Sequence, residues 1–340
     1  MNTNNLYEVR EFFLKNIKEI IHALGYSLIK VKKRDSKTIK IRLANQNKVI
    51  AAHKQKPSRE ILVKKYFTVD IEAKPGINHL REALNWLIRE SIYLNRTPLV
   101  FTPQFDSIHN YDIEISTTWS KYIDLKNIKI NDINIQAVEN DEVTNLEDLS
   151  ILWIERNHII TDNENEEFDL IIRHNKTGLK IDNLHDFLGI TEQKVQLPPS
   201  KRVLETYTQV RNQLKNYTAM HVRRGDMLSM TDKFPHLDED TKPDKIKEKI
   251  SQIIPKGSNI YILTNERNPD FFNPLKNDYE ILQYYNFPEL QKIVACKEPD
   301  NFLLFEIEKL IFESANTKIY TFTHPEGGVR ISLCKDLGWA

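Results

Sequence analysis

The stretch YFTVDIEAKPGINHLREALNWLIRESIYLNRTPLVFTP, residues 66–103, combines two kinds of hydrophobic pattern. Residues 66–73 and 97–103 are short apolar runs typical of strands, whereas residues 79–94 carry apolar side chains at helical spacing. A strand, a glycine-containing turn (74–78), a helix and a second strand make a βαβ unit, whose two strands run parallel. The stretch therefore predicts an α/β fold with a parallel sheet.

The C-terminal half of the chain repeats this alternation. Strands are predicted over residues 217–222, 259–264 and 318–322 with a short segment around 279–284, and helices over 243–253, 301–315 and from about Gly328. Two such halves predict two Rossmann-like domains, divided near residue 195.

The remaining N-terminal segments are less regular. Residues 6–24 place apolar side chains on one helical face, and Gly25 follows as a stop. Residues 27–43 read as a hairpin, residues 131–138 as a strand, and the polar residues 161–167 as a loop. We expect the helix and the hairpin to belong to the N-terminal domain.

Composition places the chain among ordinary globular proteins. Of its 340 residues, 40% are hydrophobic and 28% are charged, which is enough for packed cores. Lysine and arginine (48) balance aspartate and glutamate (48), so the chain lacks the positive field typical of a nucleic-acid-binding protein. Any site for an anion therefore has to be built locally.

Two further expectations follow from sequence features. Cys296 and Cys334 lie in apolar runs, which predicts buried free thiols and neither a disulfide nor a zinc site. The N-terminus lacks a signal pattern, and no apolar run is long enough to span a membrane. We therefore expect a cytoplasmic protein.

Polar clusters begin where three strands of the C-terminal half end. They are HVRRGD (221–226), TNERNP (264–269) and THPEGGVR (323–330). Ligands of open α/β sheets bind outside the carboxyl ends of the strands, so we expect the three clusters to converge on one crevice.

Each cluster has a structural alternative. Arg223 offers a forked donor for phosphate and Gly225 permits close approach, but an Arg–Asp pair with Asp226 could equally hold the turn together. Asn265 and Glu266 either contact a ribose or base or cap the following turn. The glycines of the third cluster either expose N–H groups to an anion or simply begin a helix.

Together these motifs resemble those of the fucosyltransferases that use GDP-fucose, a group that includes α1,2-, α1,6- and protein O-fucosyltransferases. Residues 221–226 are similar to the first motif of the group, residues 260–272 to the second and residues 313–330 to the third. Residues 74–101 resemble the first turn and helix of its N-terminal domain, and residues 119–128 a segment of the protein O-fucosyltransferase branch.

The resemblance implies a GT-B architecture, in which two Rossmann-like domains face across a cleft. Residues 1–195, with the helix and hairpin of residues 1–60, would form the acceptor-side domain, and residues 196–340 the domain that binds the nucleotide sugar. It also implies an inverting transfer of fucose from GDP-fucose to a hydroxyl group, with no metal and no cofactor besides the donor.

The resemblance also implies roles for residues around the donor. His221 would lie near the guanine or ribose, Arg223 would contact the β-phosphate, and Arg224 would be a second contact or an orienter. Glu308 falls where the group has an aspartate that reads the guanine. The other implied donor contacts are Gly76 and Asn78 in the N-terminal turn, Asn265, Glu266, Arg330, and Thr323 with His324, which replace a pair of small hydroxyl residues.

The sequence does not decide which residue is the base that deprotonates the acceptor. Asp226 and Asp232 follow the arginines, and Glu82 and Asp106 are the candidates from the N-terminal domain. The acidic run LDED (237–240) is interpreted as solvated charge in a loop, and not as a metal site.

The sequence also leaves open the chemical class of the acceptor and the identity of the donor. A glycan, a protein hydroxyl and a small metabolite are all possible acceptors. A different nucleotide sugar as donor, or a nucleotide-binding homologue without catalysis, would fit the same motifs.

Overall fold

The computed structural model describes residues 64–175, 182–232, 234–321 and 332–333. The chain divides into two compact units, residues 1–62 and 63–340, and everything described here belongs to the second. The helix predicted over residues 6–24 and the hairpin predicted over residues 27–43 lie outside the described residues.

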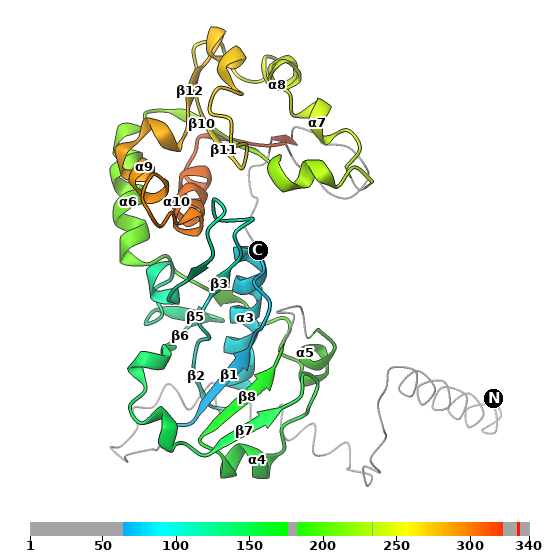
Figure 1. Ribbon diagram of the computed structural model, residues 1–340, viewed down its shortest axis with the longest axis vertical. Coiled ribbons are helices and arrows are strands. Elements are labelled where there is room, and N and C mark those ends of the chain that lie inside the picture. Colours follow the sequence, from blue (N-terminus) through cyan, green and yellow to red (C-terminus); the bar gives the residue numbers. More distant parts are fainter. Residues whose placement is uncertain (1–63, 176–181, 233, 322–331, 334–340) are drawn as a thin grey trace, which may run out of the picture. The chain divides into compact units, whose positions relative to one another are not determined.

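The first sheet contains the predicted βαβ unit. Its order is β2 (Thr97–Pro98), β1 (Tyr66–Asp70), β8 (Leu170–His174) and β7 (Ile151–Ile154), and all neighbours pair in parallel. Helix α3 (Ile77–Tyr93) connects β1 to β2 (Figure 1). Leu80, Leu84 and Leu87 are fully buried on this helix, as expected for a crossover helix that packs on its sheet.

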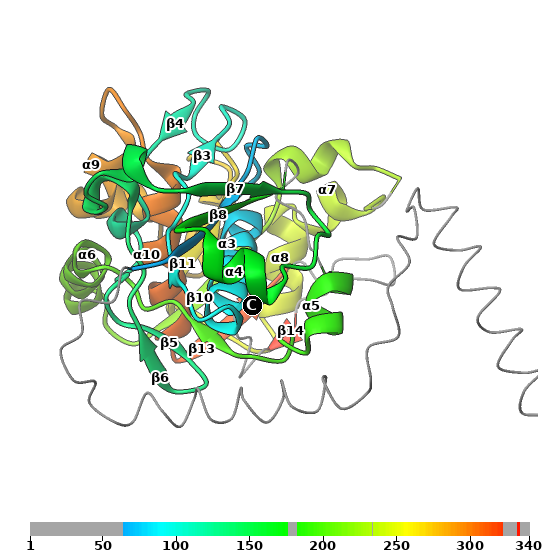
Figure 2. The ribbon, with the colours of Figure 1, turned by 90° about the horizontal axis from the view of Figure 1, so that it is seen from below.

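The second sheet has the order β12 (Glu280–Leu282), β11 (Asn259–Thr264), β10 (Tyr217–Val222), β13 (Thr317–Tyr320) and β14 (Ser332–Leu333). The first four strands are parallel and β14 is antiparallel. Helix α8 (Pro243–Ile250) packs on the face of Met220, and α10 (Asn301–Glu313) packs on the opposite face with Ala219 (Figures 1 and 2). This sheet therefore has helices on both faces.

The strand order of the second sheet reverses at β10. From β10 the chain proceeds to β11 and β12 on one side, and then returns to place β13 on the other side. The crevice outside such a reversal, at the carboxyl ends of the two adjacent strands, is where open α/β sheets bind ligands. The HVRRGD segment begins in β10 and continues directly past its end.

The remaining elements are short connections and covering helices. They are β3 (Gln104–Phe105), β4 (Ile115–Ser116), β5 (Ile128–Ile130), β6 (Ile133–Ile135), α4 (Asp162–Glu167), α5 (Asp182–Leu188), β9 (Val195–Gln196), α6 (Lys201–Gln213), α7 (Leu237–Asp240) and α9 (Pro288–Val294).

The α/β class with parallel sheets is confirmed, and the structure corrects three details. Residues 162–167 form helix α4 and not a loop, because Thr161 and Glu164 make a reciprocal capping box. The helix predicted from about Gly328 lies mostly outside the described residues, but Ser332 and Leu333 within it form a strand. Cys296 is exposed and not buried, while Cys334 lies outside the described residues.

The division near residue 195 stays a prediction. One continuous apolar cluster runs from Phe67 and Ile171 of the first sheet to Ala219 and Leu303 around the second. The two sheets are therefore packed through a common core within the second unit.

Candidate functional site

A tight turn follows β10 and leads into the 3-10 helix η4 (Gly225–Ser229). Gly225 has a φ of 46°, in the left-handed region that favours glycine. A Cβ at this position would lie 2.2 Å from the amide nitrogen of Asn265. Glycine is therefore required here both by backbone conformation and by the close approach of a neighbouring loop.

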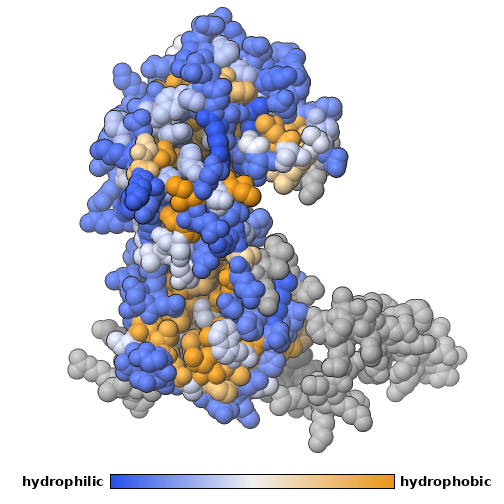
Figure 3. Space-filling model, in the orientation of Figure 1, coloured by the Kyte–Doolittle hydropathy of each residue, from blue (hydrophilic) through white to orange (hydrophobic). Residues whose placement is uncertain are grey.

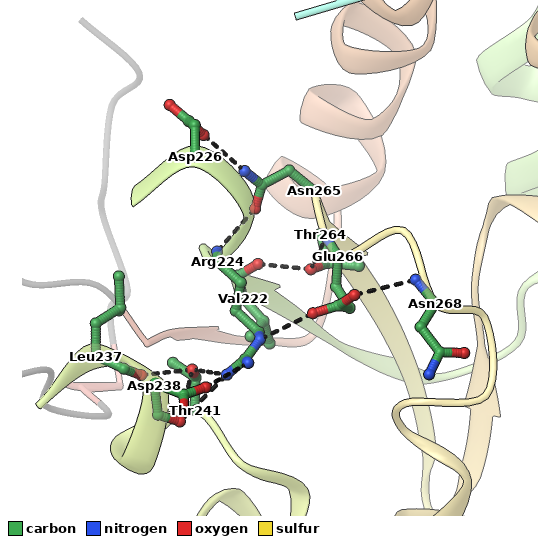
Figure 4. Close-up of polar contacts among 10 residues, drawn as sticks. All are labelled: Val222, Arg224, Asp226, Leu237, Asp238, Thr241, Thr264, Asn265, Glu266 and Asn268. Carbon is green, nitrogen blue, oxygen red and sulfur yellow. Dashed lines mark hydrogen bonds and ion pairs between the residues drawn. The ribbon is translucent and has the colours of Figure 1, made fainter. Parts of the chain in front are cut away.

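Asn265 joins the turns that follow β10 and β11. Its Oδ1 accepts a hydrogen bond from the backbone N–H of Arg224 at 2.7 Å, and its Nδ2 donates to Asp226 Oδ1 at 3.0 Å (Figure 4). The Thr264 hydroxyl donates to the carbonyl of Val222 at 2.8 Å. Two of the three predicted clusters thus meet at one edge of the sheet.

Arg224 is buried at this edge of the sheet, where its side chain holds the surrounding loops in place. Its side chain is 5% exposed, its Nε donates to Glu266 at 3.0 Å and its Nη2 donates to Asp238 at 2.6 Å. Its guanidinium also lies 4.3 Å from the ring centre of Phe271 and donates to Thr241. Of the two roles implied for Arg224, the structure favours that of an orienter, since its donors are used within the protein (Figure 4).

Arg223 has a different environment from its neighbour. Its Nη2 lies 2.9 Å from Asp226 Oδ1, and both side chains are 28% exposed. The Arg–Asp pair considered as an alternative is therefore present. A pair that is this accessible contributes only about 0–1 kcal/mol, so an incoming anion can compete for the guanidinium.

His221 lies at the end of β10, beside β13. Its ring centre is 4.8 Å from that of Tyr320, and its carbonyl accepts hydrogen bonds from the backbone N–H and the hydroxyl of Thr321. Burial, assisted by the charge of Arg223, lowers the pKa of His221 to about 3. The imidazole is therefore neutral at physiological pH.

Glu308 is buried on α10 and faces the second sheet. The hydroxyl of Tyr261 donates to its Oε1 at 2.8 Å. Burial raises the pKa of Glu308 to about 8, although the hydrogen bond from Tyr261 opposes this shift. At neutral pH the side chain is therefore mostly a carboxylic acid, which can both donate and accept a hydrogen bond.

The predicted N-terminal turn ends at the beginning of α3. Gly76 is the N-cap of this helix with a φ of −62°, and no side chain caps the helix. A Cβ on Gly76 would meet the His109 ring at an ordinary 3.7 Å. Neither the backbone nor the described neighbours thus require glycine at position 76, and Asn78 is exposed in the first helical turn.

The base candidates are dispersed. Asp226 is held in the turn by Asn265 and Arg223, and Asp232 lies in an exposed turn beyond η4. Glu82 is half-buried on α3, and Asp106 accepts a hydrogen bond from the backbone of His109. No described contact joins one of the N-terminal candidates to the turn after β10.

Several predicted residues lie beyond the described ranges, and one functional partner was missed. Thr323, His324 and Arg330 lie outside the described residues. The prediction of solvated charge in a loop at residues 237–240 is wrong on both counts, because these residues form helix α7 and Asp238 is an ion-pair partner of Arg224. Asp238 lies 14 residues after Arg224, so the amino-acid pattern around either residue does not indicate that they pair.

The described residues contain neither a metal-binding cluster nor a membrane-spanning helix. Within residues 64–175, 182–232, 234–321 and 332–333, no group of three or more histidine, cysteine, aspartate or glutamate side chains is placed to hold a metal ion. None of the helices in these ranges has the length and apolar content needed to cross a bilayer.

Comparison with known proteins gives structural matches only. No family model and no curated protein sequence matches the chain. The chain is similar to the crystal structure of POFUT1 in complex with GDP-fucose, with a TM-score of 0.47, 8% identity, and coverage of 77% of this chain and 92% of the other.

Two other solved structures are similar as well. They are a mutant of FUT1 from Arabidopsis thaliana in complex with GDP (TM-score 0.40, 12% identity, 89% of this chain and 82% of the other) and the fucosyltransferase NodZ from Bradyrhizobium (TM-score 0.38, 7% identity, 80% and 99%). A similar fold does not establish a shared activity, so the residues of the site have to carry any functional conclusion.

Proposed function

We propose that the protein is a glycosyltransferase that transfers fucose from GDP-fucose to a hydroxyl acceptor, with inversion at the sugar carbon. The observation that carries the proposal is the pair of adjacent arginines after β10. Arg224 is buried and its Nε, Nη1 and Nη2 all donate to partners within the protein, whereas Arg223 remains accessible beside it.

This arrangement suits a diphosphate leaving group. Departure of the sugar leaves negative charge on the β-phosphate, and a guanidinium held in advance stabilises that charge more strongly in the transition state. The backbone N–H of Arg224 is already bonded to Asn265, so the turn is rigid before the ligand arrives. Arg223 only has to exchange Asp226, a half-exposed partner, for a phosphate oxygen.

Two further features support a nucleoside diphosphate as the ligand. The strand order reverses at β10, where such ligands bind in doubly wound sheets. Helix α3 has Gly76 as its N-cap and no side-chain cap, and the positive end of its dipole favours an anion at this point. The donor would therefore use the C-terminal domain and the first turn of the N-terminal domain.

The experiment is a calorimetric titration of the full chain with GDP and with UDP, followed by hydrolysis of GDP-fucose without acceptor. We expect GDP to bind at least tenfold more tightly than UDP and fucose to be released slowly. Stronger binding of UDP would change the donor to a UDP-sugar. Binding of GDP without release of fucose would indicate a nucleotide-binding protein that has lost catalysis.

A further inference from the structure

The first sheet carries a polar and aromatic cluster that the donor site does not use. His174 ends β8 and Asp70 ends β1, and the two residues are direct neighbours in the parallel ladder. His174 Nδ1 lies 3.2 Å from Asp70 Oδ2, with side chains that are 34% and 37% exposed. The Trp153 ring stacks on the His174 ring at 4.9 Å with an angle of 29°.

The three residues share one face of the sheet. Trp153 pairs with Ile172, two residues before His174, so alternation directs Trp153, His174 and Asp70 to the same side. Arg173 points to the other side, where it donates to Glu90 of α3. The cluster therefore lies on the face opposite α3.

That face is only partly covered. At its amino end, Tyr66 and Leu170 pack against Leu99, Val138 and Val143. Towards its carboxyl end Trp153 is 53% exposed, and Ile151, at the amino end of the same edge strand, is 40% exposed. Figure 3 shows apolar surface in the region where Figure 1 draws β1, β2, β7 and β8. A parallel sheet is ordinarily buried on both faces, so an open end of this kind suggests a binding surface.

The chemistry of the cluster suits an uncharged ring that bears hydroxyl groups. An exposed indole offers an apolar face against which the C–H groups of a pyranose can pack. Asp70 accepts hydrogen bonds, and an Nδ1–H donor to Asp70 leaves Nε2 of His174 as an acceptor. No described residue bonds to that Nε2. The carboxylate disfavours a phosphate, in contrast to the arginine-rich turn after β10.

We infer that Trp153, His174 and Asp70 form a subsite for a neutral sugar ring, and hence that the acceptor is a glycan. The assignment of the ring to an acceptor rests on the proposed function, whereas binding of the ring itself does not. Trp153 is the stacking residue, and His174 and Asp70 are positioning residues for its hydroxyl groups.

The test uses the full chain and calorimetric titration with four neutral oligosaccharides: lactose, N-acetyllactosamine, chitotriose and maltotriose. We expect at least one to bind and Trp153→Ala to weaken that binding about tenfold or more, as truncation of a central aromatic contact does. Trp153→Phe should retain most of the affinity, and His174→Ala should also weaken binding. Phe187→Ala, which removes another exposed aromatic (68%) from α5, is the matched control and should change nothing.

The outcomes separate the two proposals. Trp153→Ala should leave GDP affinity unchanged. The subsite is overturned if none of the four saccharides binds, or if Trp153→Ala binds them as tightly as wild type, even where GDP binds. It is also overturned if the enzyme transfers fucose only to a protein acceptor. Saccharide binding that depends on Trp153, with no GDP binding, would leave the subsite standing and remove the proposed transferase.

Discussion

The carboxyl ends of the two parallel sheets differ in charge and in exposure. The second sheet ends in a turn with two arginines, and its two faces are covered by helices. In the first sheet, Asp70 ends β1, His174 ends β8 and the exposed Trp153 lies one residue before the end of β7. All three lie on the face opposite α3. One edge thus suits an anion and the other an uncharged hydroxylated ring, which matches the two substrates of a glycosyl transfer.

The buried arginines of the two sheets show how each edge is held. Arg173, which is 1% exposed, donates to Glu90 and to the carbonyls of Glu155, Arg156 and His158. Arg224 has a similar set of bonds, but its partner Asp238 is 63% exposed. The partners of Arg173 are buried or are backbone carbonyls, so this network only holds the fold together. The network of Arg224 includes the exposed Asp238 and lies next to the proposed donor site.

The largest expected effect is on Arg173. Arg173→Met removes the guanidinium that pairs with buried Glu90 and leaves only His185, whose Nε2 lies 3.5 Å from Glu90 Oε2. We therefore expect a loss of about 3–5 kcal/mol in the free energy of unfolding, measured with urea. Arg224→Met should cost less, about 2 kcal/mol, because water can solvate Asp238. An equal or reversed order would contradict the distinction between the two networks.

Substitution of Gly225 tests whether the turn after β10 has to be rigid for nucleotide binding. Gly225→Ala places a Cβ against Asn265 in a left-handed conformation, so we expect a loss of about 1–2 kcal/mol and weaker GDP binding. Gly257 has a φ of 78° and no neighbour within 4 Å, so Gly257→Ala is the control for the backbone term alone. Equal GDP affinity in Gly225→Ala and wild type would show that the turn does not bind the nucleotide.

Glu308 gives the second sheet a pH dependence, because burial raises the pKa of its carboxyl group. With a pKa of about 8 in the folded state and 4.5 in the unfolded state, the folded protein binds the extra proton between these values. Stability from this group is therefore fully present below pH 4.5 and is lost as the pH rises towards 8, by up to about 1 kcal/mol per pH unit.

Glu308→Gln should remove this slope while its amide oxygen still accepts from Tyr261. The measurement is urea unfolding of wild type and variant at pH 5, 6, 7 and 8. The difference between the two should shift steadily in favour of the variant as the pH rises. A constant difference would mean that the carboxyl group is ionised throughout.

The smallest expected change in stability is at Gly76. Gly76→Ala meets only an ordinary contact with His109, so we expect a change of less than about 0.5 kcal/mol in the free energy of unfolding. If the donor approaches this turn closely, GDP affinity should nevertheless fall. A variant with unchanged stability and unchanged GDP affinity would remove Gly76 from the donor site.

The sequence predicted the strands of the second sheet well, because they are uninterrupted apolar runs followed by polar turns. Residues 217–222 and 259–264 are strands over the predicted residues. Helix α4 could have been found too, since Thr161 and Glu164 have the spacing of a capping box.

The parts that could not be predicted depend on contacts between distant segments. Asp70 and His174 are 104 residues apart and meet only because β1 and β8 pair. Trp153 belongs to a short edge strand with no distinctive pattern. Burial of Arg224 beside an accessible Arg223 likewise follows from loops after β11 and from α7, which the arginine pair itself does not specify.

The central claim is that Arg223 binds a nucleoside diphosphate. The direct measurement is a titration of GDP into wild type, Arg223→Ala and the control Arg202→Ala, in which an exposed arginine of α6 is removed. We predict a loss of about 10- to 100-fold in GDP affinity for Arg223→Ala, the scale of a charged hydrogen bond, and none for the control. Equal affinity of wild type and Arg223→Ala would contradict the claim.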